Sequence, residues 1–210
     1  MSNKKTVIIL VTFFILLSAV FMGYFYKETR VKVKKLPVLG NPGQKVTDFS
    51  FTDQDGKTLT LNDVKGKVYV TEYFFTTCKG ICPKMNENMT RVYNAYKGNS
   101  DFMILSHTVD PKKDTVQAMK EYSLRFEANP EQWKFLTGDK KELYDMARYS
   151  YLVSATDDTT GVDIASDFIH TDKFVLVDRD GRIRGQYDGT KPASVGALIA
   201  DIGILLKEKE

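Results

Sequence analysis

Apolar residues follow two distinct patterns along this chain. Thr6–Tyr26 is an unbroken apolar run without a charged residue, and its length is about what a helix needs to cross a bilayer. Beyond residue 45, short apolar stretches alternate with amphipathic segments. The pattern predicts a short N-terminal tail (1–5), a transmembrane anchor (6–26), a basic tether (27–44) and one folded domain (45–210).

The apolar run is expected to be an uncleaved, single-pass anchor. A signal peptide has a shorter apolar core followed by small residues, whereas bulky residues continue here from Val20 to Tyr26. The run contains no cysteine, so a lipid anchor on a thioether is not expected. A buried core helix is disfavoured, because the run is apolar all round and lies at the extreme N-terminus.

The folded domain reads as strands alternating with helices. Alternating apolar residues around Asp55-Gly56 predict a β-hairpin over 49–61. Together with a final hairpin around Asp180-Gly181, this order predicts an α/β sandwich that carries an N-terminal β-hairpin extension. Further strands are expected at 68–75, 101–109, 133–136, 174–178 and 182–187, and helices at 84–96, 114–126, 140–149 and 193–206. Asp114 is expected to cap the second of these helices.

Charge is distributed unevenly along the chain. The first 35 residues carry a net charge of +6 while the whole chain carries +3, which leaves −3 on residues 36–210. A nucleic-acid-binding domain would need a basic face of its own, so no nucleic-acid partner is expected. The basic flank instead suits anionic headgroups. Basic residues border the apolar run on both sides, so charge alone leaves its orientation open.

Both cysteines, Cys78 and Cys82, lie where a predicted strand meets a predicted helix. The positive end of the helix dipole favours thiolates, the form that attacks disulfides and binds metals. A purely structural disulfide here would close only a small loop and stabilise little. Redox chemistry or metal binding is therefore the better interpretation.

The spacing of the cysteines separates these two chemistries. Disulfide oxidoreductases of the Cys-x-x-Cys kind have two intervening residues, and here there are three, Lys79, Gly80 and Ile81. Two thiolates do not complete a zinc site, which needs four ligands. They do suit Cu(I), and an imidazole from elsewhere would let the site hold Cu(II) as well. Met85 and Met89, one helical turn apart, are expected to be packing residues, as are Tyr73–Phe75 and Trp133.

Four ordered motifs resemble the Sco/SenC family: FFTTCKGICP (74–83), VDPKKDT (109–115), WKFLTG (133–138) and IHT (169–171). The resemblance covers roughly Gly43 to Leu206. It implies a membrane-anchored, thioredoxin-like metallochaperone, rather than an enzyme, that delivers copper to the binuclear copper site of cytochrome c oxidase during assembly. It also implies that the soluble domain lies on the extracytoplasmic (periplasmic) side, and that its partners are the copper-bearing oxidase subunit and a copper donor protein.

The same resemblance assigns the site residues. It implies that Cys78, Cys82 and His170 bind the copper ion, as Cu(I) or Cu(II), and that Asp110 and Asp114 lie around the site or in a docking loop. The other histidine, His107, departs from the family pattern, and its role is left open. A lone histidine is usually a hydrogen-bonded or surface residue.

Two enzymatic alternatives remain. A thiol–disulfide oxidoreductase would use the Cys78/Cys82 pair without His170, and its substrate could be the cysteines of the oxidase subunit. A peroxidase-like thiol protein would need an arginine beside its reactive cysteine, and the sequence offers no clear one.

Overall fold

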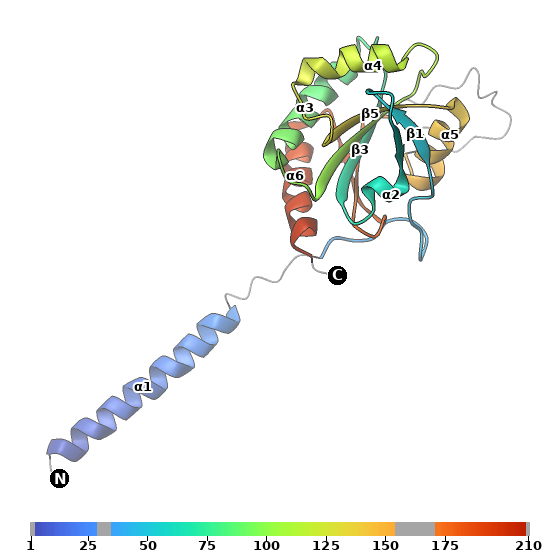
Figure 1. The fold of residues 1–210 in the computed structure, drawn as a ribbon. Helices are drawn as coiled ribbons and strands as arrows, with labels where there is room; N and C mark the ends of the chain where they lie inside the picture. The colour runs from blue at the N-terminus through green and yellow to red at the C-terminus, as the bar shows by residue number, and fades with distance from the viewer. Residues whose placement is uncertain (1–2, 29–34, 154–170, 209–210) are drawn as a thin grey trace. The chain divides into compact units, whose positions relative to one another are not determined.

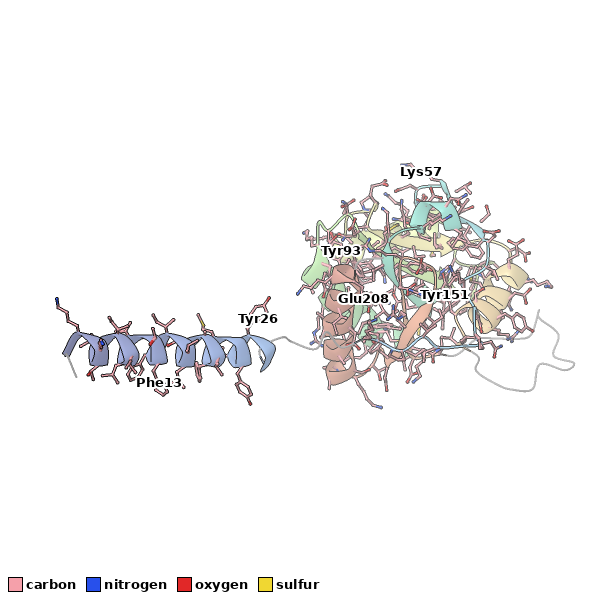
Figure 2. All side chains as sticks on the ribbon, turned by 90° about the horizontal axis from the view of Figure 1, so that it is seen from below. Phe13, Tyr26, Lys57, Tyr93, Tyr151 and Glu208 are labelled. Atoms are coloured by element: carbon pink, nitrogen blue, oxygen red, sulfur yellow. The ribbon has the colours of Figure 1, made fainter. Side chains whose placement is uncertain are left out.

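The computed structural model describes residues 3–28, 35–153 and 171–208. These fall into two compact units, Met1–Lys35 and Leu36–Glu210. The first contains a single helix, α1 (Asn3–Glu28). Its side chains stand out all round, as Phe13 and Tyr26 do in Figure 2. Among the described residues, Lys4–Tyr26 is the one helical stretch long and apolar enough to cross a membrane.

The second unit is built on a seven-stranded mixed sheet with the order β2-β1-β5-β4-β3-β6-β7. The central strands β3, β4 and β5 are parallel, and the other neighbouring pairs are antiparallel. The strands are β1 (Ser50–Asp53), β2 (Thr58–Thr60), β3 (Val68–Phe74), β4 (Phe102–Thr108), β5 (Trp133–Thr137), β6 (Lys173–Val177) and β7 (Ile183–Asp188).

Helices cover both faces of this sheet (Figure 1). Side chains of α3, α4 and α6 pack on one face, and those of α2, α5 and the π-helical turn pack on the other. The helices are α2 (Leu61–Val64), α3 (Cys82–Tyr96), α4 (Val116–Ser123) followed by a 3-10 turn (Leu124–Phe126), α5 (Lys140–Asp145) followed by a π-helical turn (Met146–Ser150), and α6 (Pro192–Lys207). The predicted sandwich with an N-terminal hairpin is confirmed.

Most element boundaries lie within one residue of the sequence prediction, and three helices differ by more or in kind. Helix α3 begins at Cys82, two residues early, because Pro83 fits the first turn of a helix, where its missing N–H costs nothing. The helix expected to begin at Asp114 begins at Val116, and its cap is Thr115, which accepts a hydrogen bond from the Ala118 amide. The helix expected over 140–149 ends as a π-helical turn.

The segment before the hairpin is fixed to the domain from Leu36 onward. Leu36 is buried, and its carbonyl oxygen accepts a hydrogen bond of 2.8 Å from Arg184. Arg184 also donates to the Pro37 carbonyl oxygen, and the Leu39 amide donates to Ile183. Part of the predicted tether is therefore an edge of the folded unit, held beside β7.

Candidate metal centre

Cys78 lies in the loop that joins β3 to α3, and Cys82 is the first residue of α3. The loop turns sharply at its start, where the Cys78 amide donates to the Phe75 carbonyl oxygen at 3.2 Å. Cys78 and Cys82 line a cavity of about 290 Å³, together with Phe75, Val109, Thr171 and five further residues of β3 and the loop (Tyr73, Phe74, Lys79, Gly80 and Ile81). The carboxyl ends of β3 and β4 thus form the floor of this cavity.

The two thiols differ in environment. Both are free, Cys78 is half-buried, and Cys82 is only 4% exposed in the core cluster beneath α3. Both side chains line the same small cavity and three residues separate them along the chain, so the pair suits one disulfide or one ion.

Cys82 does not have the lowered pKa expected at a helix N-terminus. Burial raises the pKa of its thiol to about 12, helped by the neighbouring Cys78 thiol and by the negative charges of Cys78 and Glu72. Loss of hydration outweighs the helix dipole here because the sulfur lies in an apolar cluster. The expectation that the helix N-terminus favours the thiolate is therefore wrong for Cys82.

Asp114 holds the cysteine loop in place instead of capping a helix. Its carboxylate is fully buried. It accepts hydrogen bonds from the Thr76 amide at 3.2 Å, from the Thr76 hydroxyl and from the Thr108 hydroxyl. Since Thr76 lies two residues before Cys78, Asp114 ties the loop to the end of β4.

Asp110 has a different setting from Asp114. It is half-buried, and its carboxylate pairs with exposed Lys113 at 3.0 Å. The Lys113 and Asp114 amides donate to the Asp110 carbonyl oxygen, which forms the turn expected at Asp110-Pro111. Both acidic residues therefore lie in a loop that neighbours the cysteine loop. Asp114 is buried against the cysteine loop, and Asp110 lies at the half-exposed rim.

His170 lies outside the described residues. Its chain neighbour Thr171 is described, and Thr171 lines the cavity that contains Cys78 and Cys82. Consecutive Cα atoms are about 3.8 Å apart, so the backbone reaches the cysteine cavity one residue after His170.

His107 lies on the opposite face of the sheet from the cysteines. Its ring stacks on Tyr73 with 5.1 Å between centroids and meets Phe51 and Tyr151 at 5.4 Å and 5.6 Å. Within residues 35–153 and 171–208, neither ring nitrogen has a hydrogen-bond partner, and burial lowers the pKa of the imidazole to about 3. A neutral, enclosed imidazole on this face is a core residue of the second cluster, separate from the cysteine cavity.

This burial makes His107 a source of acid sensitivity. The unfolded imidazole takes up a proton below about pH 6.5 and the folded one does not, so stability is lost as pH falls from 6.5 towards 3. We expect His107→Phe to raise the free energy of unfolding, and to raise it by about 2 kcal/mol more at pH 5 than at pH 7.5. Urea titrations at both pH values measure this difference.

A matched control for that prediction is Tyr151→Phe. It removes a hydroxyl that is also buried without a partner, but this phenol has a raised pKa and does not titrate between pH 5 and 7.5. Its effect on stability should be the same at both pH values. A gain from His107→Phe that is equally independent of pH would contradict the assignment.

Sequence reasoning missed Glu72, a fully buried carboxyl in the middle of β3. It accepts a hydrogen bond of 2.7 Å from the Ser106 hydroxyl, and its other oxygen has no partner. The available signal was an acidic residue inside the apolar run 68–75, where one is rarely placed without a reason.

The residues expected to have packing roles do pack in the core. The buried ones are Met85, Met89, Tyr73, Phe74 and Trp133, and Phe75 packs against the core partly buried.

Comparison with known proteins places this arrangement. The SCO1/SenC family matches residues 39–206. The SCO1 protein homolog of Bacillus subtilis is 32% identical over 161 residues, which are 75% of this chain and 80% of that protein.

Two solved structures have a similar fold. BsSco, described as a member of the Sco family of cytochrome c oxidase assembly proteins with a disulfide switch, has a TM-score of 0.67 and 29% identity over 82% of this chain and 99% of its own. Bradyrhizobium japonicum ScoI, solved with copper bound, has a TM-score of 0.59 and 27% identity over 75% of this chain and 99% of its own.

Proposed function

Because this chain belongs to the SCO1/SenC family, we propose that it is a membrane-tethered copper-binding metallochaperone. Its cargo is a copper ion, and it delivers this ion to the binuclear copper site of cytochrome c oxidase during assembly. The observation that carries the proposal is the pair of free thiols, Cys78 and Cys82, which line one small cavity.

The donor set suits copper. Two thiolates satisfy Cu(I), which is soft and accepts a low coordination number. Cu(II) prefers a nitrogen donor in addition, and His170 supplies it, one residue before the wall of the cavity at Thr171. Among the described residues no group of three His, Cys, Asp or Glu side chains could hold a metal, and His170 lies outside them.

The other elements anchor the chain, support the cysteine loop and contact the partner proteins. Helix α1 anchors the chain, and the domain lies on the extracytoplasmic (periplasmic) side. Asp114 supports the cysteine loop from behind, while Asp110, at the rim, faces the partners. These are the copper-bearing oxidase subunit and a protein that supplies copper.

A second function, thiol–disulfide exchange, is favoured by one observation. Cys78 is half-buried and Cys82 is buried with a raised pKa, which is how an attacking thiol and a resolving thiol differ. Exchange of this kind could reduce the cysteines of the oxidase subunit before copper arrives.

The variant His170→Ala separates the two functions. It should keep much of the Cu(I) affinity, lose stable Cu(II) binding with its sulfur-to-copper charge-transfer absorption, and leave thiol exchange by Cys78 and Cys82 intact. Copper titrations and oxidase assembly in cells are the measurements. If assembly fails in His170→Ala while exchange survives, delivery of copper is the function. Normal assembly in His170→Ala, with failure in Cys78→Ser, would favour the reductase.

A further inference from the structure

Two buried side-chain oxygens without a hydrogen-bond partner lie on the cysteine face of the sheet in the described part of the chain, one each from Glu72 and Asn86. Glu72 stands in β3 between Val70 and Phe74, which belong to the same core cluster as Cys82. Side chains two apart in a strand share a face, so Glu72 points into the core beneath α3. Asn86, in α3, donates to the Cys82 carbonyl oxygen at 3.0 Å.

The surroundings of Glu72 are poor in groups that stabilise its charge. Ser106 donates its one hydrogen bond, and Ser106 in turn accepts a bond of 2.9 Å from the Trp133 indole. One hydroxyl does not replace the water that a carboxylate loses on burial. Burial therefore raises the pKa of Glu72 to about 7, and the side chain can be neutral or charged near neutral pH.

In the described part of the domain, two titratable groups feel the charge of Glu72, Cys82 and Tyr122. The Tyr122 phenol also feels both thiols. The basic group on this cluster is Arg125, whose guanidinium lies 4.8 Å from the centre of the Tyr122 ring. β4 and β5 contribute only uncharged side chains here, Ser106 and Trp133. Among the residues that the structure describes, the charged groups that act on Cys82 are thus Cys78 and Glu72, and both are acidic.

The effect of an ionised Glu72 on metal binding depends on the charge of the bound ion. When two thiolates bind a cation, both thiol protons leave. A monovalent cation then leaves one negative charge on the pair, and a divalent cation leaves none. At the low effective dielectric of a protein interior, an ionised Glu72 repels the first complex and has little effect on the second.

We propose that Glu72 determines the selectivity of the cysteine pair between monovalent and divalent soft cations. As the neutral acid it admits both, and as the carboxylate it disfavours the monovalent one. This inference rests on the proposed function, because it needs a metal on Cys78 and Cys82. Loading with Cu(I) is then coupled to a proton held by Glu72, and loading with Cu(II) is not.

Ag(I) and Hg(II) test the proposed selectivity without a change of oxidation state. Both are soft, both accept two thiolates in linear coordination, and they differ in charge. Their affinities for the reduced full-length chain in detergent are measured by competition with dithiothreitol, without oxygen, at several pH values from 5.5 to 8.5. Both cations displace the same two thiol protons, so the pH dependence that these protons cause cancels in the ratio of the two affinities.

We expect the Ag(I) to Hg(II) affinity ratio to fall by about tenfold between pH 5.5 and 8.5 in the wild type. In Glu72→Gln, which keeps the shape and an acceptor for Ser106, the ratio should stay constant. In Ser106→Ala the fall should move to higher pH, because the carboxylate loses the hydrogen bond that favours it. His170→Ala should leave the fall in place, which excludes an imidazole as its source.

The outcomes separate this inference from the proposed function. If the reduced chain binds neither cation, the proposed function fails and this inference fails with it. If both cations bind and their ratio does not change with pH, or falls equally in Glu72→Gln, the role of Glu72 alone is wrong. Ser106→Ala keeps the test valid should Glu72→Gln not fold.

Discussion

Oxidation of Cys78 and Cys82 to a disulfide is expected to take copper binding from about one ion per chain to none. Thiolates are the ligands, and a disulfide offers no anionic sulfur to a metal. The structure favours the oxidation step, because the two side chains line the same small cavity and only three residues separate them along the chain. Copper per chain, measured after anaerobic gel filtration of the reduced and oxidised forms, gives the answer.

Two controls sharpen that experiment. Cys78→Ser and Cys82→Ser should each bind copper weakly whether or not an oxidant is present, since one thiolate remains and no disulfide within the chain can form. Met85→Leu, which changes a buried core residue without removing a proposed ligand, should bind like the wild type. Equal copper binding by the oxidised and reduced wild type would refute the assignment of the cysteines as ligands.

Asp114→Ala is expected to lower the free energy of unfolding by about 3 kcal/mol and to weaken Cu(I) binding by roughly tenfold to a hundredfold. The stability loss follows because the Thr76 amide and two hydroxyls lose their buried acceptor. The affinity loss follows because a side chain that orients a ligand loop affects the metal nearly as much as a ligand does. Urea denaturation and competition with a Cu(I) chelator measure the two effects.

Asp110→Asn is the matched control for that variant. It changes an acidic residue four positions away whose partner, Lys113, is an exposed lysine. Surface pairs of this kind contribute less than about 1 kcal/mol, so both stability and Cu(I) affinity should change little. If Asp110→Asn and Asp114→Ala had equal effects on Cu(I) affinity, the specific role of Asp114 in holding the loop would be disproved.

The elements of the fold were predictable because their signals are local. Asp55-Gly56 predicts the first hairpin, and Gly56 does adopt a positive φ of 74° there. The two faces of the central sheet also follow from a local signal. Alternation along β4 separates Ser106, on the side of the cysteines, from His107, on the other side. The period of two along a strand is therefore enough to place His107 away from Cys78.

The roles of Asp114 and Glu72 depend on distant residues, which local patterns do not contain. Asp114 and Thr115 are both good helix caps, and the choice between them is made by Thr76 and Thr108, which bind the carboxylate. The run around Glu72 predicts an ordinary strand and nothing about its carboxyl group. The role of that group follows from the core that encloses it.

The attachment of residues 36–39 beside Arg184 fixes the point at which the chain enters the folded unit. Arg184 follows Ile183, whose partner Val177 pairs in turn with Tyr69, near the start of β3. Cys78 follows the other end of that strand, and β3 has seven residues, so it spans about 23 Å. The point at which the chain enters the folded unit and the cysteine loop are therefore separated by the length of β3.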